Sequence, residues 1–80
     1  MKYRVTIRIK DGVLDPEMET LHRLLQRSGV KNIRQLSHQQ IYDIEFGNGV
    51  GASEAAAVAQ TVAGDVLANP EIHDWTVEQA

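Results

Sequence analysis

The 80-residue chain contains no cysteine, only two prolines, a single tryptophan and no long run of apolar residues. The lack of cysteine excludes disulfides, thiolate metal sites and a cysteine nucleophile. The first ten residues, MKYRVTIRIK, alternate charged and apolar side chains and so lack the continuous apolar stretch of a signal peptide. Nothing elsewhere approaches the roughly 20 apolar residues of a membrane span. We therefore expect a soluble cytoplasmic protein with no membrane partner.

Positive charge is also scarce, since 8 basic residues stand against 11 acidic ones and give a formal charge of −3. A nucleic-acid or anionic membrane surface gains no help from this balance, so we expect no nucleic-acid partner. The basic residues at positions 2, 4, 8 and 10 are better explained as the solvated outer face of a sheet. The length predicts one domain, residues 1–80, whose small core favours self-association.

Hydrophobic spacing predicts the first half of the chain as a strand followed by a helix. Residues 3–10 alternate strictly, which is typical of a half-buried strand. Asp15 and Pro16 are suited to the cap and first position of a helix. Gly29 is suited to end that helix in the left-handed conformation, with Val30 folding back toward Leu25.

The second half of the chain is predicted to contain three further strands and one helix. A short strand is expected at 33–36, a polar hairpin loop at 37–40 and an alternating strand at 41–46. The outward acids of that strand, Asp43 and Glu45, are expected to pair with the basic face of the first strand. A helix is expected at 53–68 with Ser53 as its cap, and a last strand follows Pro70 at 71–78.

This order of elements predicts an α+β fold of the two-layer ferredoxin-like type, β-α-β-β-α-β. Such a chain forms a four-stranded antiparallel sheet with both helices on one face. RNA-recognition domains share the order, but QQIYDIEF lacks their Lys/Arg-Gly-aromatic signature and carries acids that repel phosphate. The sequence therefore disfavours an RNA-binding role.

The sequence offers no catalytic constellation and no metal site. GNGVGA at 47–52 satisfies the G-x-G-x-x-A form of the dinucleotide fingerprint, but the strand before it alternates polar and apolar residues, unlike a buried parallel strand. A flexible Gly-rich turn is the simpler interpretation. The three histidines, at 22, 38 and 73, lie in separate elements without metal-ligand spacing. The serines and carboxylates show no arrangement for nucleophilic or paired acid–base catalysis.

Two stretches are more specific than these periodicities. KDGVLDPEMETLHRLLQRSGV, followed later by VLANPEIHDWTVE, resembles the PurS family, the small subunit of phosphoribosylformylglycinamidine (FGAM) synthase. The resemblance covers nearly the whole chain, although Met18 stands where many members have glycine and the hairpin at 34–42 is longer than usual. Lys10 and Gly29 match the family pattern. The other matching residues, which the resemblance marks as a family motif and an expected interface, are Gly12, Val13, Leu14, Asp15, Pro16, Thr20, Leu67, Asn69, Pro70, Ile72, Asp74 and Trp75.

The resemblance implies a noncatalytic subunit of a purine-biosynthetic ligase. In that family the complex amidates formylglycinamide ribonucleotide with ATP and glutamine, and magnesium serves the complex. A PurL-type synthetase and a PurQ-type glutaminase do the chemistry, while PurS dimers bridge them and support ammonia transfer. We thus expect no cofactor on this chain, and self-association as a homodimer or tetramer.

Two other function classes remain open from the sequence. A regulatory module of the ACT type has the same order of elements and binds small molecules, but only an analogy of fold supports it. An independent nucleotide-binding enzyme has only the GNGVGA match in its favour.

Overall fold

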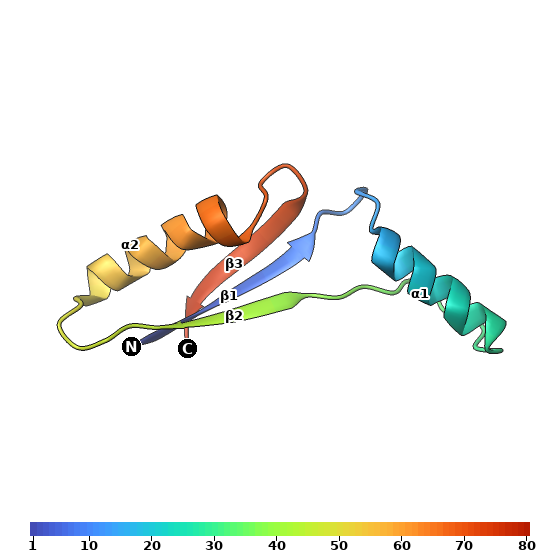
Figure 1. Cartoon of the computed structure of the whole chain (residues 1–80), viewed down its shortest axis with the longest axis horizontal. Helices are drawn as coiled ribbons and strands as arrows, with labels where there is room; N and C mark the ends of the chain where they lie inside the picture. Colours follow the sequence, from blue (N-terminus) through green and yellow to red (C-terminus); the bar gives the residue numbers. More distant parts are fainter.

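The computed structural model describes all 80 residues as an α+β fold with a three-stranded antiparallel sheet and two helices (Figure 1). The sheet order is β2-β1-β3, so β1 is central and pairs antiparallel with both neighbours. In chain order the elements are β1 (Lys2–Ile9), α1 (Pro16–Arg27), β2 (Gln40–Glu45), α2 (Ala52–Val62), the π-helical turn η1 (Ala63–Leu67) and β3 (His73–Gln79).

The core lies between one face of the sheet and α2. The alternation of β1 turns Tyr3, Val5 and Ile7 inward, as the sequence predicts, and all three are buried. Alanines spaced four apart on α2 and η1, at 55, 59 and 63, are fully buried against them. Because alanine has a small side chain, the helix approaches the sheet closely, and the core remains thin.

Local signals confirm the predicted ends of α1. The Asp15 side chain accepts a hydrogen bond from the Met18 N–H, and Pro16 takes the first helical position. Gly29 has a φ of +91°, and the Val30 N–H donates to the Leu25 carbonyl at 3.1 Å. This is the 6→1 bond that ends helices in a left-handed glycine.

The second helix departs from prediction at both ends. It begins at Ala52 with Gly51 as its N-cap and no capping side chain, so the prediction of Ser53 as the cap is wrong. At its far end the Ala68 N–H donates to the Ala63 carbonyl at 2.9 Å, which widens the last turn into η1. The helical pattern at 53–68 was nevertheless sufficient to locate the element.

The chain is much more elongated than a compact domain. Its extents are 54 × 23 × 15 Å and its Cα radius of gyration is 16.6 Å. A compact chain of this length has a radius of gyration of about 12 Å. Figure 1 shows the cause, since α1 lies beyond the end of the sheet, opposite to the end where α2 begins. We call residues 10–39, which carry α1 out from β1 and return to β2, the arm.

Two parts of the ferredoxin-like prediction are therefore wrong for the single chain. Residues 33–36 pair with no strand, so the sheet has three strands, and there is no hairpin at 34–42. Only α2 covers the sheet, because the connecting segments hold α1 away from it. The physical reason is that backbone pairing needs a neighbouring strand, and the returning segment runs outward past the end of β1.

Candidate docking surface

The two sequence motifs meet at one end of the sheet. The Lys10 N–H donates to the Ile72 carbonyl at 2.9 Å, which joins the segment after β1 to the turn before β3. On the open face of the sheet, the Arg8 guanidinium lies 3.9 Å from the Asp74 carboxylate. Segments separated by about 60 residues in the sequence thus lie together at this end of the sheet.

The first motif bends the chain out of the sheet and starts α1. Gly12 has a φ of +84°, which other residues adopt only with strain. Val13 and Leu14 follow with 36% and 64% of their surfaces exposed. Two apolar side chains therefore face solvent directly before the capped start of the helix.

The second motif is a turn closed by hydrogen bonds around Asn69. Its side-chain oxygen accepts from the Glu71 N–H at 3.1 Å, and its carbonyl accepts from the N–H groups of Ile72 and His73. Its own N–H donates to Nδ1 of His73 at 2.8 Å, which requires Nδ1 to be unprotonated. Pro70 is exposed and needs no donor partner there. Asn69 and His73 of this motif thus have a local structural role, because their hydrogen bonds close the turn.

We call the sheet together with α2 and η1 the body. Trp75 lies at this end of the body. It is half-buried and packs against the core, as does Leu67. A Cβ built on Gly64 would lie only 3.1 Å from Cζ2 of the indole, so the glycine allows η1 to approach the ring. Thr20 lies apart from this end of the sheet, on an exposed part of α1, where its hydroxyl accepts from Arg23 at 3.4 Å.

The outer face of the sheet carries paired charges. The register places Arg4 opposite Asp43, and the guanidinium Nε donates to the carboxylate at 2.9 Å, as the sequence predicts. This hydrogen bond and the charge of Arg4 hold the pKa of Asp43 below its usual range. The same hydrogen bond raises the pKa of Arg4. These charges are satisfied within the chain and need no ligand.

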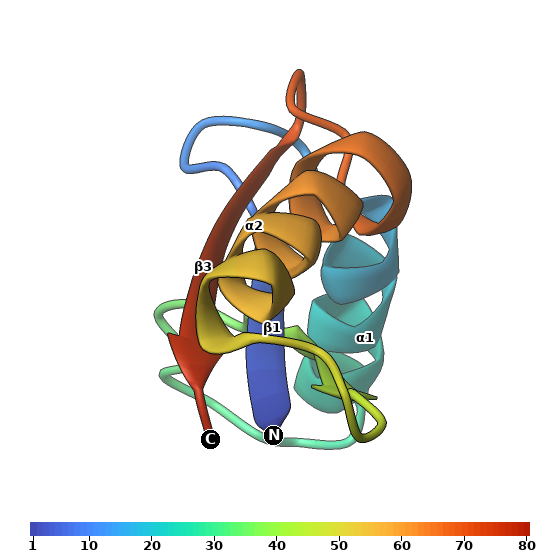
Figure 2. The same cartoon turned by 90° about the vertical axis from the view of Figure 1, so that its left-hand side faces the viewer.

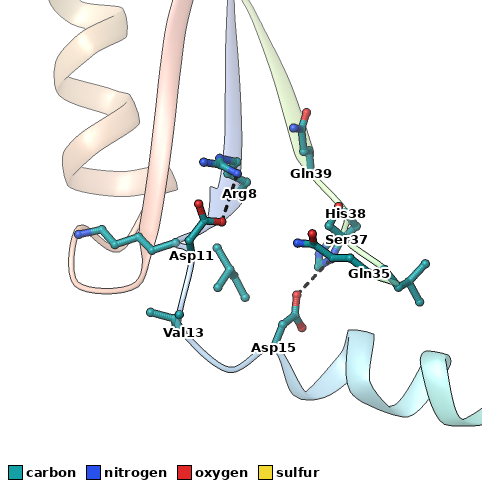
Figure 3. A pocket seen from close by; sticks show the side chains of 12 residues that line it. Arg8, Asp11, Val13, Asp15, Gln35, Ser37, His38 and Gln39 are labelled. Atoms are coloured by element: carbon teal, nitrogen blue, oxygen red, sulfur yellow. Dashed lines mark ion pairs between the residues drawn. The ribbon is translucent and has the colours of Figure 1, made fainter. Parts of the chain in front are cut away.

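A polar hollow of about 360 Å³ lies at the root of the arm (Figure 3). Residues 8–13 and Asp15 line one side and residues 35–39 the other. Across it, Nδ1 of His38 lies 3.4 Å from the Asp15 carboxylate. Sequence reasoning placed His38 in an ordinary loop and missed this contact, because nothing in the sequence relates residues 15 and 38.

No part of the chain presents a metal-binding cluster. No group of three or more histidine, aspartate or glutamate side chains is placed to hold a metal ion. No helix is long and apolar enough to cross a membrane. The Gly-rich loop at 47–51 leads from β2 into α2, but β2 pairs with an antiparallel neighbour, unlike the strands of the parallel sheet that carries a dinucleotide site.

Comparison with known proteins gives a family for these features. The family model PurS, described as phosphoribosylformylglycinamidine (FGAM) synthase, matches residues 2–80. A curated relative, the PurS subunit of FGAM synthase from Methanocaldococcus jannaschii, is 31% identical over 77 residues, which cover 96% of this chain and 92% of the relative. The Mycobacterium leprae PurS subunit is 29% identical over 73 residues, which cover 91% of this chain and 87% of that relative.

Solved structures agree with the sequence matches. The crystal structure of M. jannaschii PurS, described as one of the subunits of formylglycinamide ribonucleotide amidotransferase, has a TM-score of 0.76 and 30% identity. The match covers 96% of this chain and 92% of that one. A chain in the PurLQS structure from Thermotoga maritima shares the fold, with a TM-score of 0.64, 20% identity and coverages of 96% and 93%. These findings give no support to an ACT-type module.

Proposed function

The chain belongs to the PurS family, and from this premise we propose that it is the noncatalytic structural subunit of the FGAM synthase complex. The complex amidates formylglycinamide ribonucleotide with ATP and glutamine in purine biosynthesis. The observation that carries the proposal is the family match over residues 2–80 of a chain without a catalytic cluster. ATP and magnesium then belong to the partner subunits, and this chain carries no cofactor. The role implies a cytoplasmic location.

The proposed partners are a PurL-type synthetase and a PurQ-type glutaminase. The PurLQS complex of Thermotoga maritima supports this proposal, because a chain of the same fold occurs in it. In the proposed role the chain bridges the two enzymes and supports ammonia transfer between them. An elongated shape of 54 Å is suited to contacting two large proteins at once.

Self-association is the second part of the proposal, and it is motivated by α1. Leu21 and Leu24 lie on the apolar stripe of this helix yet are 40% and 49% exposed, because no other element of the chain covers them. A helix of 12 residues is marginal in water unless its apolar face is packed. A second copy of the chain offers the missing surface.

The surface that α1 would cover on the second copy is the free flank of α2. Gly64 packs against Trp75 of β3, so the helical positions of Val58 and Val62 turn toward the β2 side. Val58 is 40% exposed. Viewed along the long axis, α1 projects beside α2 on the side away from β3 (Figure 2). A second copy related by a two-fold axis, with its arm pointing in the opposite direction, would place its α1 there.

This exchange would also complete the ferredoxin-like arrangement. Each sheet would then have two helices on one face, α2 of its own chain and α1 of the other. The extended residues 31–39 would lie beside the second copy's sheet and could supply the fourth strand. The motif residues at the end of the sheet, Val13, Leu14 and Ile72 among them, remain exposed. We propose these three as part of the surface that contacts the larger subunits.

Reconstitution tests the function. PurL-type and PurQ-type proteins from the same organism should make FGAM from glutamine in the presence of this chain and lose that activity without it. Leu14→Gln should weaken formation of the complex, measured by light scattering, because Leu14 is a 64% exposed motif residue. Ile41→Gln is the matched control, since Ile41 is 57% exposed but lies outside both motifs.

Three results would contradict the proposal. Equal glutamine-dependent rates with and without the chain would remove its role in the complex. Equal weakening by Leu14→Gln and Ile41→Gln would remove the motif surface as the specific contact. Activity of the chain alone would contradict its noncatalytic role.

A further inference from the structure

Two connecting segments attach the arm to the sheet, and their backbones form no hydrogen bonds with each other. No backbone hydrogen bond joins the outgoing residues 10–15 to the returning residues 31–39. The outgoing segment is tied back to the body by the bond from Lys10 to Ile72. The direction of α1 relative to the sheet therefore depends on side-chain contacts at the root of the arm.

The contact between Asp15 and His38 is the side-chain link across this root (Figure 3). One carboxylate oxygen of Asp15 lies 3.4 Å from Nδ1 of His38, and the other accepts from the Met18 N–H at 3.3 Å. The Asp15 side chain is only 19% exposed, so solvent screens it less than a surface carboxylate. His38 is thereby connected, through one carboxylate, to the first turn of α1.

The charges around His38 come from several elements. Glu17 of α1 joins Asp15 in the hollow next to the imidazole, and both are acidic residues. Arg8 of β1 lines the same hollow and opposes that charge, while His73 of β3 uses its Nδ1 to accept from Asn69. Lys10 and Asp11 line the adjoining hollow and have opposite signs. The carboxylate at 3.4 Å is the ion-pair partner that His38 has in the structure.

We propose that the Asp15–His38 pair is a proton-dependent clasp that sets the position of the arm. Histidine ordinarily gains its charge between about pH 8 and pH 5. The charged imidazole donates a hydrogen bond to the carboxylate and holds the two connecting segments together. The neutral ring forms at most a weaker contact, and the arm becomes free to swing about residues 10–15 and 35–39.

A second histidine in the arm provides a natural contrast. Nε2 of His22 lies 3.2 Å from the Ile33 carbonyl and donates to it. This bond needs a proton on Nε2, which the neutral and the charged ring both can carry. His22 therefore fixes α1 to the returning segment at either pH, whereas the contact of His38, which is made to a carboxylate, is strongest when the ring is charged.

Distance measurement between the arm and the body tests the clasp. The chain has no native cysteine, so spin labels can be placed at Gln26→Cys on α1 and Gln79→Cys on β3 without other changes. Dilution with unlabelled protein restricts the signal to pairs within one chain. Between about pH 8.5 and about pH 5.5 we expect the population with the arm in the position seen in the structure to grow relative to the population with a displaced arm. The ratio of the two should rise about twofold to fivefold, the range for a partly exposed ion pair.

Variants assign the effect. His38→Gln should abolish the pH response, and so should Asp15→Asn, which keeps the helix cap because asparagine caps as well as aspartate. His22→Gln should keep the response. A wild-type distance distribution that does not change with pH would overturn the clasp, as would a response that survives His38→Gln or is lost in His22→Gln. The measurement needs neither enzyme, so it stands or falls separately from the proposed role in FGAM synthase.

Discussion

The body, formed by the sheet with α2, and the arm, which carries α1, are built in opposite ways. Of the eight buried residues, seven lie in the body and only Met18 lies in the arm. The body covers its apolar face with a helix of its own chain, whereas the arm exposes part of its apolar stripe. Since burial of apolar surface is the main source of folding stability, the body must stabilise the chain.

This contrast separates stability from recognition within 80 residues. The arm has a sharply defined start and end, since Asp15 caps α1 and Gly29 ends it. Its helix is thus encoded locally, but the surface that should cover Leu21 and Leu24 is absent from the same chain. A locally encoded helix with an uncovered stripe is what a segment for association with another copy requires.

The largest effect should come from the core of the body. Ile7→Ala removes most of a side chain that is 2% exposed, and should lower the free energy of unfolding by about 2 to 5 kcal/mol. Ile41→Ala, on a residue that is 57% exposed, is the matched control and should change it little. Urea unfolding followed by circular dichroism measures both. Equal decreases in the free energy of unfolding for the two variants would mean that the core of the body is not the main source of stability.

The second effect should appear in association and not in folding of the body. Leu24→Ala on the exposed stripe of α1 should weaken self-association by about 1 kcal/mol per copy, because Leu24 is 49% exposed and only that part can be buried on association. Sedimentation equilibrium measures the change. Gln26→Ala, on an exposed polar position of the same helix, should leave association unchanged. A Leu24→Ala protein that associates as tightly as the wild type would refute the role of the stripe.

The same division explains which features the sequence could predict. Alternation in β1, the caps of α1 and the pairing of Arg4 with Asp43 are local or pairwise patterns, and the structure confirms them. The strand at 33–36 could not be judged locally, because pairing depends on a neighbour that the chain alone does not provide. The resemblance located both motifs, and the structure brings them together through Lys10 and Ile72.

Two details of the candidate site had no signal in the sequence. The contact of His38 with Asp15 joins residues 23 positions apart across the arm, and its existence depends on how both connecting segments run. The π-helical turn η1 occurs in an ordinary helical pattern, at the place where Gly64 meets the indole of Trp75. Both are consequences of tertiary packing, which periodicity does not describe.

The smallest effect should be found at the charged outer face of the body, which sharpens the contrast with its apolar inner face. The hydrogen bond from Arg4 lowers the pKa of Asp43 in the folded chain, so the pair contributes stability above about pH 4, the usual range of an unfolded aspartate. That contribution is lost as the pH falls through the lower folded pKa. A double-mutant cycle with Arg4→Gln and Asp43→Asn should show a small favourable coupling at neutral pH that salt weakens and strong acid removes, because both side chains are well exposed. Glu45→Gln, on the same strand face, should show no comparable coupling to Arg4. A coupling that persists unchanged in strong acid would show that the two side chains interact through packing and not through charge.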